Sequence, residues 1–181
     1  MALLLGFREL LPRTVIIHKA ISFACSYIPQ ICNLGLYLIS EGLPQLNNEE
    51  RFSVIFSHFP AGTSLQTFNH YLQGVRSGEF RYYNYDWQTN LDVYGRIEAP
   101  RIHLEKIENF PVQVIVGEED ELATLEDAEW MKEALGRNTV EEEVVLDIGH
   151  ETFVLGKDVS YVRRLVLPFL KRHEGRVEEM Q

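Results

Sequence analysis

Basic side chains are scarce in this sequence. Its 181 residues include 17 lysines and arginines against 27 aspartates and glutamates, which gives a formal net charge of −10. A nucleic-acid surface needs a stripe of lysine or arginine to neutralise phosphates, and no such stripe is present. We therefore expect no nucleic-acid partner and interpret the acidic residues as a solvated surface.

Long apolar runs are missing as well. The richest segment, residues 15–39, is broken by polar residues such as His18, Lys19 and Asn33, so we expect no transmembrane segment. The apolar residues Leu3, Leu4 and Leu5 could suggest a signal peptide, but no basic residue precedes them, and the charged Arg8 and Glu9 follow almost at once. The sequence therefore predicts no signal peptide within this chain.

Thiols and metal-ligand patterns are sparse too. Cys25 and Cys32 are the only cysteines, and their spacing suits either one local disulfide or two reduced core residues. The six histidines show no ligand spacing with the cysteines or with one another. We expect neither a metal nor a cofactor.

The second half of the chain holds one organised stretch. A β-branched run at 111–116 leads to Asp120, helical spacing follows at 125–136, and a second run at 143–148 leads to His150. In an open parallel sheet, the loops that follow both strands emerge at the same edge. Asp120 and His150 are therefore expected to meet, although they lie far apart in sequence.

An acid that orients a histidine is two thirds of a nucleophile-activating triad. The order of acid and then histidine along the chain is that of the α/β-hydrolases. Glu118, Glu119 and Asp147 stay open as alternative acids. The nucleophile is missing, because none of the eight serines lies in a Gly-x-Ser-x-Gly motif.

The first part of the chain has a helical pattern. Residues 7–46 predict helices that are broken near Pro12, Pro29 and Pro44. Their apolar residues occupy more than one face. Such helices must be covered by protein or must meet a lipid-like ligand.

Several shorter elements are predicted in the rest of the chain. Residues 52–56 are predicted to form a short extended run. Thr63 and Ser64 precede a predicted helix at 65–74 and are expected to cap its first amides. This capping role makes Ser64 a poor candidate for a nucleophile. Residues 90–101 look irregular. After His150, apolar residues of 162–170 form one helical face that includes Pro168.

Taken in order, these motifs resemble those of the gastric and lysosomal acid lipases, a group of α/β-hydrolases. The resemblance covers nearly the whole chain, and its most specific piece is the turn that follows His58. The motifs that carry it are Leu5-Gly6-Phe7-Arg8-Glu9-Leu10-Leu11-Pro12, the Cys25 and Cys32 pair, His58-Phe59-Pro60-Ala61-Gly62-Thr63-Ser64, Asp86-Trp87, Gly117-Glu118-Glu119-Asp120 and His150-Glu151-Thr152-Phe153-Val154-Leu155-Gly156.

The resemblance implies a fold of the α/β class. Residues 86–181 would be the C-terminal portion of an α/β-hydrolase, with two or so parallel strands and flanking helices. Residues 1–85 would form the helical cap or lid in front of it. The family places its serine motif before the cap, so the chain resembles the C-terminal part of an acid lipase: a fragment, an incomplete gene model or a truncated paralogue.

The resemblance also implies a function. It indicates a neutral-lipid ester hydrolase that acts on triacylglycerols or sterol esters at a lipid-droplet or micelle surface, with Asp120 as the triad acid and His150 as the triad histidine. Without a serine motif the chain itself is expected to be inactive. The alternatives are a non-catalytic paralogue that binds lipid or a partner through the cap, and a hydrolase of another branch, which reduced cysteines would favour.

The cysteine pair bears on the cellular setting that the family implies. Cys25 and Cys32 occupy the place where the cap of some members carries a disulfide. A disulfide there would suit a secreted or lysosomal protein. Two features depart from the family pattern: Phe59 stands where the family has serine, and the chain has no N-glycosylation sequon.

Overall fold

The chain folds into two compact units, which are described separately. One comprises residues 1–21 and 54–104, and the other comprises residues 22–53 and 105–181. The expected division into residues 1–85 and 86–181 stays a prediction. This computed structural model describes residues 9–10, 14–38, 42–108, 110–136 and 139–174.

The second unit contains a parallel pair of strands. β3 (Val112–Gly117) pairs with β4 (Val140–Leu146), and Ile115 lies opposite Val144. The crossover between them carries α6 (Leu125–Leu135), which begins at a capping box formed by Thr124 and Asp127. A strand, helix and parallel strand is the βαβ arrangement that the sequence predicts.

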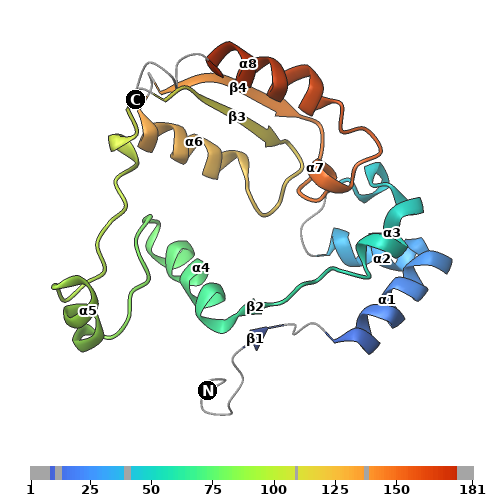
Figure 1. The fold of residues 1–181 in the computed structure, drawn as a ribbon, viewed down its shortest axis with the longest axis horizontal. Helices are drawn as coiled ribbons and strands as arrows, with labels where there is room; N and C mark the ends of the chain where they lie inside the picture. Colours follow the sequence, from blue (N-terminus) through green and yellow to red (C-terminus); the bar gives the residue numbers. More distant parts are fainter. Residues whose placement is uncertain (1–8, 11–13, 39–41, 109, 137–138, 175–181) are drawn as a thin grey trace. The chain divides into compact units, whose positions relative to one another are not determined.

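Helices lie on both faces of this pair (Figure 1). On one face Val114 and Val116 pack with Ala128 of α6 as a buried cluster. On the other face, Gln113 Nε2 donates a hydrogen bond to Leu165 O of the π-helix η5 (Val162–Val166). η5 continues into α8 (Leu167–His173). The second unit therefore has the layered organisation of an α/β protein.

Pro168 lies in the first turn of α8. Proline donates no backbone hydrogen bond, and it stands where the hydrogen bonding of the helical run changes from the π to the α pattern. The predicted helical face after His150 is thus divided between η5 and α8. A short helix, α7 (Thr152–Leu155), lies between β4 and η5.

The second predicted strand lies earlier than expected. β4 covers Val140–Leu146 rather than residues 143–148. Glu141, Glu142 and Glu143 look too polar for a strand, but the structure places a basic side chain beside each carboxylate: His173, Arg172 and Lys132, respectively. Each glutamate side chain of the strand thus has a partner, and β4 begins at Val140, three residues before the predicted start at 143.

The N-terminal part of the second unit is helical. α1 (Val15–Tyr27) is shared with the first unit and is followed by α2 (Pro29–Tyr37). Next come η2 (Pro44–Leu46) and η3 (Glu49–Arg51). The predicted breaks at Pro29 and Pro44 are confirmed, because each proline begins a helix. Pro12 lies outside the described residues.

The helix α3 (Phe52–Ile55) corrects an expectation. Residues 52–56 are predicted to be extended, but Phe52 and Phe56 are four residues apart and both buried, as one face of a helix provides. A disulfide joins Cys25 of α1 to Cys32 of α2, with Cα atoms 5.7 Å apart. Of the two states that the spacing allowed, a disulfide or two reduced cysteines, the structure has the disulfide.

The first unit combines one short antiparallel strand pair with helices. β1 (Glu9–Leu10) pairs antiparallel with β2 (Thr63–Ser64), so the expectation of helix at Glu9 and Leu10 is wrong. α4 (Leu65–Ser77) follows β2 directly. Its N-cap is Ser64, one residue later than the spacing of Thr63 and Gln66 indicates.

α5 (Trp87–Tyr94) is a second correction in the first unit, because residues 90–101 are expected to be irregular. Asp86 caps its start, and Gly95 ends it with a positive φ of 68° that suits glycine. The side chain of Asn90 is buried inside the unit, where Asn84 Oδ1 and Ile97 O accept from its amide. A short 3₁₀ helix, η4 (Leu104–Lys106), follows.

Within the described ranges, no single helix has the length and apolar character to cross a membrane. α1 and α2 meet the length and composition requirement only when taken together. A bend of 110° separates them.

Candidate active site

Asp120 lies just after the carboxyl end of β3. The strand ends at Gly117, and Glu119 N donates to Ile148 O at 3.2 Å, which joins this loop to the loop after β4. A Cβ on Gly117 would lie 2.4 Å from Ile148 O, so only glycine fits this close approach. The chain geometry thus brings the two loops together.

The carboxylate of Asp120 is buried and held by its own loop. Its side chain is 4% exposed. Its Oδ1 accepts from Leu122 N at 2.9 Å and from Ala123 N at 2.7 Å. These two backbone donors fix the orientation of the carboxylate.

His150 meets Asp120 directly. Its Nδ1 lies 3.1 Å from Oδ1 and 3.0 Å from Oδ2 of the carboxylate. An ionised carboxylate only accepts, so Nδ1 carries the proton of this hydrogen bond. In the neutral imidazole, Nε2 then holds a lone pair, and the side chain is 39% exposed. This arrangement suits a base that takes a proton from a group outside the pair.

The structure distinguishes Asp120 from the alternative acids by position. Glu118, Glu119 and Asp147 are exposed, whereas Asp120 is buried and touches the imidazole. The predicted meeting of Asp120 and His150 is therefore observed. Their catalytic roles stay a prediction.

A pocket of about 510 Å³ adjoins the pair. It touches four consecutive residues of β3, and side chains of successive strand residues point to opposite faces, so it runs along an edge of the strand. Its walls are mainly apolar. The lining residues are Val114, Ile115, Val116, Gly117, Asp120, Ala123, Thr124, Asp127, Ala128, Met131, His150, Glu151, Phe153 and Val154.

A segment from the first part of the chain also belongs to this site. Thr152 Oγ1 donates to Asn47 Oδ1 at 2.9 Å, two residues after His150. Sequence reasoning missed both residues. Thr152 could have been suspected from its place beside His150, but Asn47 is 105 residues away and carries no local pattern that points to the site.

Ser64 acts as the predicted cap. Its Oγ accepts from Thr67 N at 2.9 Å at the start of α4. In the part of the chain that the structure describes, no group of three or more histidine, cysteine or acidic residues is arranged to hold a metal ion.

Comparison with known proteins places the chain among lipases. It is 30% identical over 143 residues to a tear acid lipase-like protein of Mesocricetus auratus, which covers 78% of this chain and 35% of the relative. It is 30% identical to lipase member K of Homo sapiens, over 71% of this chain and 32% of the relative.

The human gastric triacylglycerol lipase is 36% identical over 101 residues, which are 54% of this chain and 24% of the relative. The chain thus spans about a quarter to a third of the length of these relatives. No family model matches it.

Proposed function

The chain belongs to the acid lipase family, and from this premise we propose that it supplies the acid and the histidine of a triad that hydrolyses neutral lipid esters. The observation that carries the proposal is the contact of His150 Nδ1 with the buried carboxylate of Asp120. In the proposed cycle, Nε2 of His150 takes the proton of a serine nucleophile and returns it to the leaving alcohol. Asp120 holds the tautomer and stabilises the imidazolium.

Neutral lipid esters are the proposed substrates. One relative is named a triacylglycerol lipase, and the pocket beside His150 is mainly apolar, as an acyl chain requires. The lipid would be met at a droplet or micelle surface. We further propose that residues 1–85 form the cap of the enzyme.

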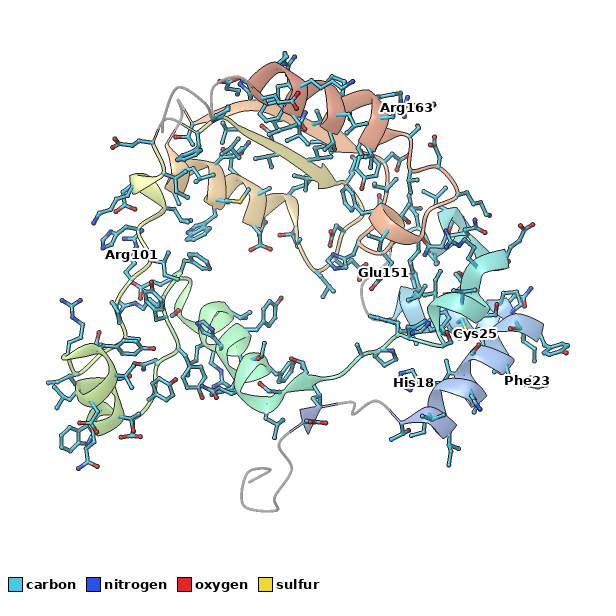
Figure 2. The ribbon with its side chains drawn as sticks, viewed as in Figure 1. His18, Phe23, Cys25, Arg101, Glu151 and Arg163 are labelled. Atoms are coloured by element: carbon cyan, nitrogen blue, oxygen red, sulfur yellow. A yellow bond between two sulfur atoms is a disulfide. The ribbon has the colours of Figure 1, made fainter. Side chains whose placement is uncertain are left out.

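Large apolar side chains of α1 and α2 support contact with such a surface. Phe23 is exposed and projects away from α1 (Figure 2). Large apolar side chains that are exposed close together often mark a site of interaction with a protein, a ligand or a membrane. Between residues 22 and 37, which cover the end of α1, the link Ile28 and all of α2, the exposed large apolar residues are Phe23, Tyr27, Ile28, Ile31, Leu34 and Tyr37.

A secreted or lysosomal setting is part of the proposal. The Cys25–Cys32 disulfide supports it, because disulfides persist in oxidising compartments and are rare in the cytosol. The same bond speaks against the third alternative, a hydrolase of a cytosolic branch, which reduced cysteines would have favoured.

We propose that the chain as given forms no acyl-enzyme, since it has no Gly-x-Ser-x-Gly serine. The test compares the purified chain with a chimera in which it replaces the matching part of human gastric triacylglycerol lipase, with p-nitrophenyl butyrate as the substrate. The chain alone should be inactive and the chimera active.

Variants of the chimera then test the residue roles. Asp120→Asn should lower kcat about 10⁴-fold, because the wrong tautomer of His150 is favoured. Asp147→Asn, which changes an exposed acid immediately after the end of β4, is the matched control and should retain activity. Hydrolysis by the chain alone that His150→Ala abolishes would show that another nucleophile exists.

A second candidate function is a non-catalytic module that binds lipid or a partner. The exposed apolar side chains of α1 and α2 favour it. In that case the chain should float with phosphatidylcholine vesicles that contain triolein, and the double variant Asp120→Asn, His150→Ala should float equally well. An inactive chimera together with retained flotation would decide for this candidate.

A further inference from the structure

One short segment touches both loops that carry the acid and the histidine. We call residues 42–48 the brace; they lie between α2 and η3 in the sequence and include η2. The brace contacts Glu119, immediately before Asp120, and Thr152, just after His150. It comes from the first part of the chain, far from either loop in sequence.

On the acid side, the contact depends on a glycine. Gly42 N donates to Glu119 O at 3.2 Å. A Cβ on Gly42 would lie 2.8 Å from Glu119 Cβ and 2.9 Å from Glu119 O, closer than side-chain atoms approach. Any larger residue would therefore push the acid loop away from the brace.

On the histidine side, the contact is a buried side-chain hydrogen bond. Asn47 is 0% exposed and Thr152 is 2% exposed, and Thr152 Oγ1 donates to Asn47 Oδ1 at 2.9 Å. Water does not compete for this bond at such depth. The other polar atom of the Asn47 side chain, Nδ2, is buried without a hydrogen-bond partner among the described residues. The bond from Thr152 to Asn47 ties the first residue of α7 to the brace.

Backbone hydrogen bonds reinforce that side. Asn48 N donates to Leu155 O at 2.7 Å, and Lys157 N donates to Leu46 O at 2.9 Å. Both ends of α7 are therefore held to the brace. His150 lies two residues before α7. Its backbone is therefore close to the segment that the brace holds, while its side chain contacts Asp120.

We propose that Asn47 is a positioning residue, which through Thr152 holds the imidazole of His150 in contact with Asp120. This inference rests on the proposed function for its catalytic meaning. The positioning itself is a property of the chain alone. It assigns part of the site to the segment between α2 and η3, which no motif of the sequence marks.

The test follows the Nδ1 proton of His150 by NMR in the full chain. A proton shared with a carboxylate resonates at low field, and its exchange with water reports how often the pair opens. The variant Thr152→Val removes the hydroxyl and keeps the shape, and Thr152→Ser keeps the hydroxyl. The matched control is Gln45→Ala, because Gln45 lies in the brace with an exposed side chain.

Thr152→Val should speed exchange of the Nδ1 proton about tenfold, as loss of one buried hydrogen bond allows. Gly42→Ala should act in the same direction from the acid side. Thr152→Ser and Gln45→Ala should stay within about twofold of the wild type. Backbone amides of β3 should exchange at wild-type rates in all four variants.

Two results would overturn the inference. One is an unchanged Nδ1 proton in Thr152→Val. The other is equal acceleration of the Nδ1 proton and the β3 amides, which would mean that Asn47 only stabilises the fold. In the chimera, Thr152→Val should lower kcat and leave KM unchanged. A chimera that is inactive without any variant would refute the proposed function, while the proton exchange would still decide the role of Asn47.

Discussion

Gly117→Ala is the sharpest structural test of how the two loops are brought together. The added Cβ would lie 2.4 Å from Ile148 O. That is about 1 Å short of an ordinary carbon–oxygen contact. The end of β3 and the loop after β4 must therefore separate, and Asp120, three residues later, moves with the strand end.

The cost has two parts. Overpacking against fixed backbone costs about 1–3 kcal/mol. Separation also breaks the hydrogen bond from Glu119 N to Ile148 O, which contributes about 1 kcal/mol. The free energy of unfolding should therefore fall by about 2–4 kcal/mol. The low-field proton of His150 should weaken or disappear.

Gly35→Ala is the matched control in the same unit. Gly35 lies inside α2, and a Cβ there would meet nothing within 4 Å. Alanine is the better helix former, so this variant should gain about 0.5–1 kcal/mol. Urea unfolding followed by circular dichroism measures both changes. If Gly117→Ala matched the wild type in stability and kept the His150 proton, the close approach of the two loops would be refuted.

Three further predictions concern the rest of the chain. Phe52→Ala should lower the free energy of unfolding by about 3–5 kcal/mol, because Phe52 is fully buried. Ile31→Ala, at an exposed site, should change it by less than about 0.5 kcal/mol. Equal losses of stability for the two variants in urea titrations would contradict this prediction. Replacing Cys25 and Cys32 together by serine should cost about 2–3 kcal/mol through the freed loop, and a melting temperature unchanged from the oxidised wild type would argue against the bond. Hydrogen bonds from Thr89 hold the pKa of Asp86 below its usual value, so the cap should stabilise α5 fully above about pH 3.9 and lose that effect as the pH falls through the lower folded pKa. Acid titration of the α5 amides should show this loss in the wild type and not in Asp86→Asn, which caps without titrating.

Local patterns predicted much of the second unit because they follow from nearest-neighbour chemistry. The β-branched run at 111–116 favours a strand, and the apolar spacing of 125–136 favours a helix. The structure has β3 at Val112–Gly117 and α6 at Leu125–Leu135. Chain topology then brings the carboxyl ends of parallel strands to one edge. That is why Asp120 and His150 could be paired from the sequence before any distance was known.

Short or distant features were not predictable in the same way. Residues 52–56 are too few to separate a helical period from an extended one, and burial of Phe52 and Phe56 decides for helix. The run of glutamates at 141–143 looks unsuited to a strand until His173, Arg172 and Lys132 stand beside it. Both corrections depend on neighbours supplied by the tertiary fold.

The sequence by itself predicted that Asp120 and His150 meet at one edge of the sheet, because residue type and strand period are local properties of the chain. It left Glu118, Glu119 and Asp147 open as alternative acids. Only the tertiary structure decided what holds Asp120 and His150 in place. Gly42 and Asn47 reach the two loops across long separations in sequence, and contacts of that kind arise from packing and leave no periodic trace. The physical reason is that a buried hydrogen bond or a close backbone approach is a property of two segments together.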